Sequence, residues 1–211
     1  MKNLLLILLT FCLYSCGSAQ LKDRWISPEA EDYTLSKVFI IGLTDNNEAR
    51  EKFEKKLQNQ LAIRGIESST SFNKFDTKFL EKKRTEAEIK SLEDQLLKEG
   101  YDAVVFTKVA GIKNKIKFKE DYSDLDKNHS FFKDDYLMYQ DQFFNPDAYQ
   151  EYQVYNAETS IYCLCPAKKR TLIWKGYIDI IDPENINQTV NDYSKLLILV
   201  LEEDRIIPLK D

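Results

Sequence analysis

The sequence predicts one α+β domain with elements in the order β-α-β-α-β, then an insertion, then β-β-α. Strand-like apolar runs alternate with amphipathic helices over residues 36–111, which indicates crossover connections and parallel pairing. Two strand-like runs joined by a polar turn occupy residues 154–180, and an amphipathic helix follows at residues 182–207. The first half is therefore expected to be α/β-like, and the second half to contain an antiparallel hairpin.

The first strand is predicted at residues 36–44, "SKVFIIGLT", because a near-continuous β-branched run is typical of a strand buried on both faces. The following helix is expected to begin at an Asp45 N-cap, with Glu48 three residues later forming a capping box. Its apolar stripe consists of Ala49, Phe53, Leu57 and Leu61. Gly65 is expected to end this helix, and a short strand, "IESSTSF", follows at residues 66–72.

The second helix is predicted at residues 85–100, "TEAEIKSLEDQLLKEG", with Gly100 as its stop. Its apolar stripe consists of Ile89, Leu92 and Leu96. A second buried strand is expected at residues 101–111, and residues 112–119, "IKNKIKFK", alternate as a separate half-exposed strand would.

The hairpin of the second half is predicted from "VYNAETSIYCLC" and "TLIWKGYIDI", residues 154–165 and 171–180. Pro166 resists strand pairing, and the basic residues after it keep the turn in water. The apolar side of the last helix consists of Ile186, Val190, Tyr193, Leu197 and Leu201. Its segment "LLILVL" is apolar all round, so this helix is expected to be buried on more than one side or to meet a partner.

The amino-terminal residues have the layout of a secretory signal, with Lys2 followed by an apolar run too short to span a bilayer. The ending Leu-Tyr-Ser-Cys at residues 13–16 resembles the lipobox of bacterial lipoproteins. That resemblance implies cleavage between Ser15 and Cys16, a diacylglycerol on the Cys16 thiol and an N-acyl chain on its amine. The alternative is an ordinary signal peptide cut after Ala19, with Cys16 discarded.

The expected organisation has three parts: a lipoprotein signal peptide at residues 1–15, a lipidated N-terminus and tether at 16–36, and the α+β domain at 37–211 with an aromatic-rich insertion at about 112–153. Fully extended, a tether of this length reaches about 70 Å, which lets the domain stand off the membrane. In the alternative, Trp25 and Ile26 dock on the domain.

Location in the cell envelope follows from the lipobox resemblance. The membrane is the first expected partner, reached through the acyl chains on Cys16. Gly17 stands where Asp would indicate inner-membrane retention, so the outer membrane is favoured. The domain is expected in the periplasm, and exposure at the cell surface stays open.

Composition argues against nucleic acid as a partner. The formal net charge is -5, and removing Lys2 with the signal makes the mature chain about one unit more acidic. Nucleic acid calls for a clustered basic face, and the Lys-rich stretch at residues 113–119 is the one local exception. The patterns indicate no cofactor beyond the acyl chains, and they leave the oligomeric state undetermined.

Two cysteines, Cys163 and Cys165, remain after Cys12 leaves with the signal and Cys16 receives lipid. Packed or free thiols are favoured for this pair, because a bond between residues two apart on one strand would be strained. A disulfide in an oxidising periplasm is the alternative. A soft-metal site would be incomplete, because no histidine lies near, and no metal is expected.

The insertion provides the candidate binding surface, because aromatic side chains between acids suit protein hot spots and stacking against sugars. Its aromatic residues are Phe131, Phe132, Tyr136, Tyr139, Phe143, Phe144, Tyr149 and Tyr152. In the alternative they form a packed cap on the sheet.

A carboxylate hydrolase is the less favoured reading of the same segment. Its acids are Asp124, Asp126, Asp134, Asp135 and Asp141, and no spacing singles out a pair. His129, the one histidine of the chain, lies in a polar segment and is expected to be solvated. No catalytic residue is therefore assigned.

Several segments together resemble a group of small Gram-negative envelope lipoproteins, whose domain is similar to the amino-terminal domain of TolB and to periplasmic domains of the CsgG and LpoB type. The segments are "KVFIIGLTDN", "AREKFEKKLQNQLAIRG", "IESSTSF", "GYDAVVF" and "LIWKGYIDI". The resemblance implies a mixed sheet of about five strands with helices packed on it. Its members bind peptides, activate peptidoglycan synthases or build secretion pores.

The expected function is that of a membrane-anchored periplasmic lipoprotein, a binding or scaffolding module for an envelope protein or a cell-wall component such as peptidoglycan. The alternative is a structural oligomeric envelope component that assembles through the last helix.

Overall fold

The fold was determined as a computed structural model. It describes residues 18–30, 33, 35–75, 82–118, 149–164, 171–183 and 185–210, and the single positions Lys133, Tyr136, Leu137, Gln140 and Phe144. The predicted signal peptide, Cys16 and most of the aromatic insertion lie outside these residues. In the part of the chain that is described, no helix is both long enough and apolar enough to cross a membrane.

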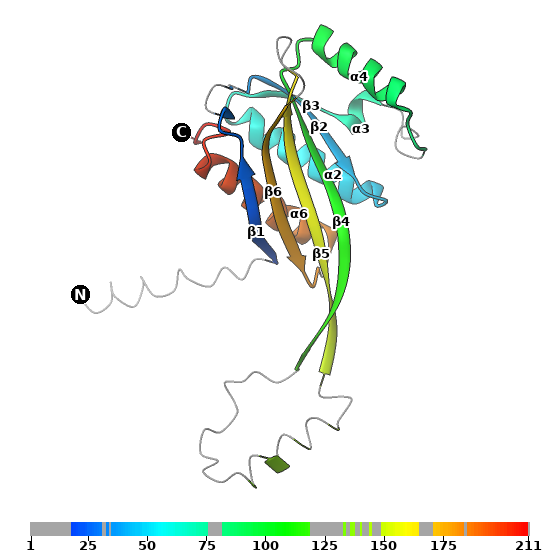
Figure 1. The fold of residues 1–211 in the computed structure, drawn as a ribbon, viewed down its shortest axis with the longest axis vertical. Helices are drawn as coiled ribbons and strands as arrows, with labels where there is room; N and C mark the ends of the chain where they lie inside the picture. Colours follow the sequence, from blue (N-terminus) through cyan, green and yellow to red (C-terminus); the bar gives the residue numbers. More distant parts are fainter. Residues whose placement is uncertain are drawn as a thin grey trace, which may run out of the picture.

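A six-stranded mixed sheet forms the frame of the molecule (Figure 1). Its strands are β1 (Ala19–Ile26), β2 (Lys37–Leu43), β3 (Glu67–Thr70), β4 (Ala103–Phe118), β5 (Tyr149–Cys163) and β6 (Leu172–Ile181), in the spatial order β1-β6-β5-β4-β2-β3. Strand β2 pairs in parallel with β3 and β4, whereas the β4–β5, β5–β6 and β6–β1 pairs are antiparallel. The structure therefore confirms the α+β class with a parallel first half, and the sheet has one strand more than the expected five.

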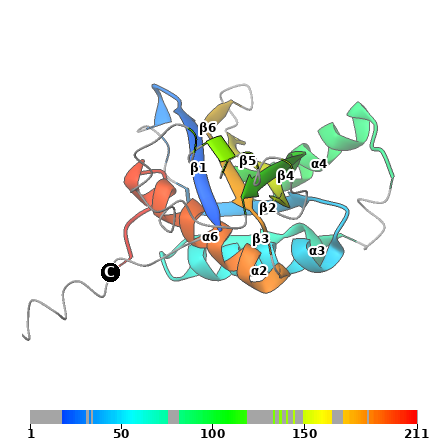
Figure 2. The same cartoon turned by 90° about the horizontal axis from the view of Figure 1, so that it is seen from below.

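Helices cover the two faces of the sheet unequally (Figure 2). They are α2 (Asn47–Ala62), α3 (Ser71–Lys74), α4 (Glu86–Lys98) and α6 (Ile186–Glu203). Helices α2 and α6 lie together on one face, and α4 packs on the opposite face beside β2. Side chains alternate along β2 accordingly: Val38 and Ile40 join the main core, and Phe39 joins the smaller cluster under α4.

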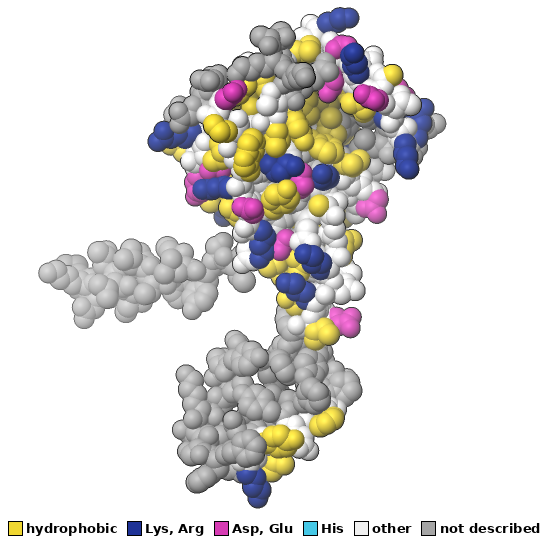
Figure 3. Space-filling view, in the orientation of Figure 1, with side chains coloured by type: hydrophobic (Ala, Val, Ile, Leu, Met, Phe, Trp, Pro, Cys, Tyr) yellow, Lys and Arg dark blue, Asp and Glu magenta, His cyan; other side chains and the backbone are white. Residues whose placement is uncertain are grey.

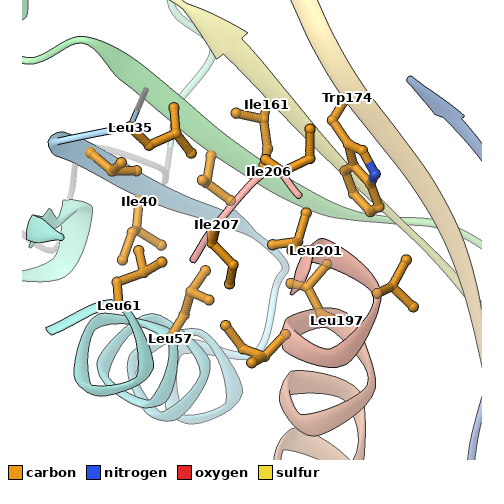
Figure 4. Packing of buried hydrophobic residues seen from close by; sticks show 14 of the residues in the cluster. Leu35, Ile40, Leu57, Leu61, Ile161, Trp174, Leu197, Leu201, Ile206 and Ile207 are labelled. Carbon is orange, nitrogen blue, oxygen red and sulfur yellow. The ribbon is translucent and has the colours of Figure 1, made fainter. Parts of the chain in front are cut away.

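The main core lies between the sheet and the α2–α6 pair (Figure 4). Leu57 of α2 and Leu197 of α6 are fully buried there, against Ile40 and Ile161 of the sheet. Full burial stabilises each such side chain by about 1.5–3 kcal/mol, so this interface is the main source of fold stability. The apolar stripes predicted for these two helices are the faces that pack.

The helix ends test the capping predictions. Thr85 and Glu88 form a complete capping box at the start of α4. Helix α2 is capped by Asn46, whose Oδ1 accepts a hydrogen bond from the Ala49 N–H at 3.0 Å. The predicted Asp45 cap is therefore wrong by one residue, and so is its capping box, because the position three residues after the cap is Ala49 and Glu48 pairs with Lys52 instead. Gly65 and Gly100 follow their helices and have φ values of 75° and 82°. Glycine adopts this left-handed conformation with little strain because it has no Cβ atom, so both residues end their helices as predicted.

Strand β1 changes the expected role of the amino-terminal segment. Residues 19–26 were expected within a tether, yet they pair with β6 along their length, from Ala19 opposite Ile180 to Ile26 opposite Trp174. The tether is therefore wrong for this stretch, and the docked alternative describes its backbone, although the Trp25 and Ile26 side chains are exposed. Backbone hydrogen bonds to β6 hold the segment at the sheet edge. Its irregular side-chain pattern did not indicate a strand.

Strand β4 is longer than predicted. The strand expected at 101–111 and the separate one at 112–119 form a single strand, interrupted only by a register shift between Val109 and Gly111. Pairing with β5 continues to Phe118 opposite Tyr149, so the two strands project beyond the rest of the sheet (Figure 1). The insertion therefore joins the far ends of one long hairpin.

The Trp174 side chain fixes the packing at the β1 side of the sheet. Its indole N–H donates to Asp204 Oδ2 at 2.8 Å, and its ring lies over Gly176. A Cβ atom at Gly176 would lie 2.2 Å from Trp174 Cη2. Only glycine leaves room for this fully buried ring.

We expect Gly176→Ala to lower the free energy of unfolding by about 1–3 kcal/mol, because the buried ring must shift to admit the methyl group. Urea denaturation followed by circular dichroism measures the change. Gly111→Ala is the matched control, because a Cβ there has Asn156 Oδ1 as its nearest neighbour at 3.9 Å. Equal losses in the two variants would contradict this account of the Trp174 packing.

Candidate functional site

The sheet face opposite α2 and α6 carries an ordered array of side chains from five strands. Strand register places them in two neighbouring rows, one through Trp25, Lys175, Ser160, Phe106 and Ile41, and the other through Asp23, Tyr177, Glu158, Lys108 and Leu43. Directly paired residues lie on the same side of a sheet, so these ten side chains share one face. We call these two rows the open face.

Helix α4 packs on this side of the sheet in the smaller cluster, which includes Phe39, Ile41 and Val104. Within the described residues, no helix packs over the part formed by β1, β6 and β5. Three large side chains of the open face are exposed: Trp25 by 46%, Leu43 by 45% and Tyr177 by 39%. Figure 3 views this side of the molecule and shows hydrophobic side chains gathered around basic and acidic ones.

An ion network lies at the centre of the open face. Glu158 Oε1 lies 3.0 Å from Lys175 Nζ and 3.3 Å from Lys108 Nζ, and it accepts a hydrogen bond from Ser160 Oγ at 3.2 Å. Glu158 is 8% exposed, although it belongs to the side of the sheet that the main helices leave uncovered. The three charged residues come from β4, β5 and β6, so their contacts join three adjacent strands.

Opposing effects set the protonation of this network. Burial raises the pKa of Glu158, but hydrogen bonds and charge from Lys175 and Lys108 lower it by more, and the pKa lies below its ordinary value of 4.5. The hydrogen bond to Glu158 raises the pKa of Lys175 above 10.5. The Glu158 carboxylate and the Lys175 ammonium group are therefore charged at neutral pH.

The chemistry of the open face suits binding. Its centre contains a carboxylate already paired with two ammonium groups, and neither row contains a histidine or a cysteine. In the described ranges no three His, Cys, Asp or Glu side chains are placed to hold a metal ion. Exposed rings beside a charged centre provide apolar contact area together with directional polar groups.

The predicted aromatic surface is only partly described. Tyr136 and Phe144 are exposed, by 57% and 73%, and Tyr152 is a half-buried residue of β5. Tyr149 also belongs to β5. The other four aromatic residues, together with the five acids considered for hydrolysis and His129, lie outside the described residues.

Of the cysteines, only Cys163 is described. It is buried at the end of β5 and is disulfide-bonded, so the favoured free thiol is wrong for this residue. Its partner cysteine lies outside the described residues, and pairing with Cys165 stays a prediction. Cleavage after Ser15 and lipid attachment at Cys16 also lie outside them.

Sequence patterns single out none of Lys108, Glu158 and Lys175, because their proximity depends on the register of three strands. Strand β6 does contain a usable signal. In "WKGYID" large or polar side chains at Lys175, Tyr177 and Asp179 alternate with buried positions, as in a strand with one uncovered face.

Comparisons with known proteins give distant structural likeness only. No family model and no curated protein matches the chain. Solved structures of the PelC dodecamer from Paraburkholderia phytofirmans are similar: one is 9% identical, covering 87% of this chain and 94% of that chain with a TM-score of 0.43. A point variant of that dodecamer is 10% identical, covering 88% and 95%, with a TM-score of 0.41. At these TM-scores and identities, the similarity supports no conclusion about the function of this chain.

We expect the Glu158 network to make stability depend on acid pH. A lowered carboxyl pKa contributes stability above the unfolded-state value, and this contribution is lost as the pH falls through the folded-state pKa. The difference in unfolding free energy between the parent protein and Glu158→Gln should therefore be largest near neutral pH and shrink below about pH 4.5.

Urea denaturation between pH 7 and pH 3 measures this difference. Glu51→Gln, at an exposed position past the first turn of α2, is the control and should show a much smaller difference from the parent than Glu158→Gln. A Glu158→Gln difference that is constant over this range would contradict the pairing of Glu158 with the two lysines.

Proposed function

We propose that the protein is a lipid-anchored envelope binding module that holds another envelope protein against its open face, and that it acts by binding rather than by catalysis. One observation supports this most: Trp25, Tyr177 and Leu43 are exposed around a buried ion network on the sheet face that α2 and α6 do not cover. Large apolar side chains exposed together on a monomer are typical of interaction sites.

The arrangement suits a protein partner. Hot spots of protein interfaces are enriched in tryptophan, tyrosine and arginine, and polar groups around them exclude water when the partner is bound. Lys108 and Lys175 retain partial exposure, with side chains 37% and 24% accessible, so they can reach acceptors on a partner while they remain paired with Glu158. A cell-wall saccharide, which stacks on exposed rings, is the competing ligand class in the test.

Anchoring is the second part of the proposal. The lipobox-like ending places an acylated Cys16 two residues before Ser18, the first described residue. Two or three acyl chains hold a protein on a membrane, whereas one chain binds reversibly.

We expect a photo-crosslinking amino acid at Tyr177 to capture one envelope protein in living cells, because this ring lies in the centre of the proposed contact. Mass spectrometry of the membrane fraction identifies the product. The same amino acid at Lys55, an exposed position on α2, is the matched control and should capture far less of that protein.

Trp25→Ala should reduce the Tyr177 crosslink at least several-fold without lowering the amount of folded protein in the membrane. Equal capture at Tyr177 and Lys55 would contradict the proposal. Specific retention of peptidoglycan fragments by the parent, lost in Trp25→Ala, with no crosslinked protein, would assign the face to a saccharide instead.

Labelling with an alkyne fatty acid tests the anchor. The parent chain should be labelled and should float with membranes, and Cys16→Ser should lose both properties because the acceptor thiol is absent. Cys12→Ser is the control and should be labelled normally, since it leaves with the signal. Unchanged labelling of Cys16→Ser would show that the lipobox interpretation is wrong.

A further inference from the structure

The amino-terminal end of β1 is held firmly on the domain. The Ser18 N–H and Oγ–H both donate to Asp192 Oδ2 of α6, at 3.1 and 2.8 Å, and the Ser18 carbonyl accepts from the Ile181 N–H at 2.7 Å. Three hydrogen bonds therefore fix the position of Ser18 against α6 and the end of β6. Strand β1 begins next to this point, at the end of the sheet where the β4–β5 hairpin projects (Figure 1).

Only Gly17 separates Ser18 from Cys16. Two residues span at most about 7 Å. If Cys16 carries the acyl chains, the end of the sheet at Ser18 is therefore held within about 7 Å of the lipid attachment point, and a long tether is not available.

The strand register shows how far the β4–β5 hairpin extends past the level of Ser18. Ser18 bonds Ile181, Ile181 lies opposite Val154, and Val154 lies opposite Lys113. The five pairs beyond this level run from Asn114 opposite Gln153 to Phe118 opposite Tyr149. At about 3.4 Å per residue the hairpin reaches about 17 Å past the level of Ser18, farther than the anchor segment can reach.

The side chains on this part of β4 alternate in character. Ile112 and Ile116 are 55% and 64% exposed, and Lys113 and Lys115 between them are exposed on the other side of the strand. Pairing with β2 ends at Lys108, so β4 has no strand partner on that edge over this stretch within the described residues. Glu151, opposite Ile116, is an exposed acid nearby.

We propose that the projecting hairpin, Ile112–Ile116 with its β5 partners, lies against the lipid surface beside the anchor. This inference rests on the proposed acylation of Cys16. The hairpin reaches about 17 Å past the level of Ser18 and the anchor segment spans about 7 Å, so the hairpin extends about 10 Å beyond the anchor. The strands therefore either enter the headgroup layer or incline along it. In both cases the two isoleucines contact the apolar edge of the lipid, and the lysine ammonium groups extend to the headgroups.

The test uses the acylated full-length mature protein in vesicles of phosphatidylethanolamine and phosphatidylglycerol. An environment-sensitive fluorophore is attached at Ile116→Cys, or at Lys98→Cys on α4 as the matched control (Figure 1). The unsubstituted chain sets the background of labelling. Nitroxide-bearing lipids should quench the Ile116 probe several-fold more than the Lys98 probe, and Ile112→Asp should reduce that quenching.

Flotation of the same samples separates the two proposals. A protein that does not float contradicts the anchor itself. A protein that floats but shows equal, weak quenching at both positions contradicts the hairpin contact and leaves the anchor intact. Disulfide crosslinking between two copies of the unlabelled Ile116→Cys variant, without lipid quenching of the labelled one, would assign the hairpin to a second copy and would also overturn the inference.

Discussion

The unequal lengths of β4 and its parallel partner β2 control the architecture. Strand β4 has 16 residues, and β2, its parallel partner, has 7. The parallel pairing therefore ends at Lys108, and the rest of β4 depends on β5 for its backbone hydrogen bonds. An unpaired strand edge can bind other chains, and lysine side chains on such an edge are one of the features that disfavour this pairing. The remaining part of β4 contains lysines of this kind at Lys113 and Lys115.

The two sides of the sheet differ in how much apolar surface they bury. The α2–α6 side contains the large apolar core, where the Trp174 ring occupies the space that Gly176 leaves. The opposite side is covered by α4 at one end only, and its polar centre is held by Glu158 between two lysines. Glu158 is nearly buried while both lysines keep partial contact with solvent, so removing the lysines would leave the carboxylate without compensation for its burial.

Under the two proposals the anchor and the ligand use different parts of the same sheet. Ser18 and the projecting hairpin lie at one end of the strands, whereas the open face runs along them. Contact between the hairpin and lipid would therefore leave Trp25 and Tyr177 accessible from the side. A short anchor also limits rotation of the domain. Because part of the rotational freedom is lost before a partner arrives, binding to the oriented surface would have a smaller entropic cost.

The sequence by itself determined the elements whose formation depends on neighbouring residues. The α2 and α6 stripes and the stops at Gly65 and Gly100 follow from helical periodicity and from glycine's access to positive φ. Tertiary structure decided the rest. The edge strand β1, the continuity of β4 and the meeting of Lys108, Glu158 and Lys175 all depend on pairing between distant segments, and local side-chain patterns do not specify which strand lies beside which.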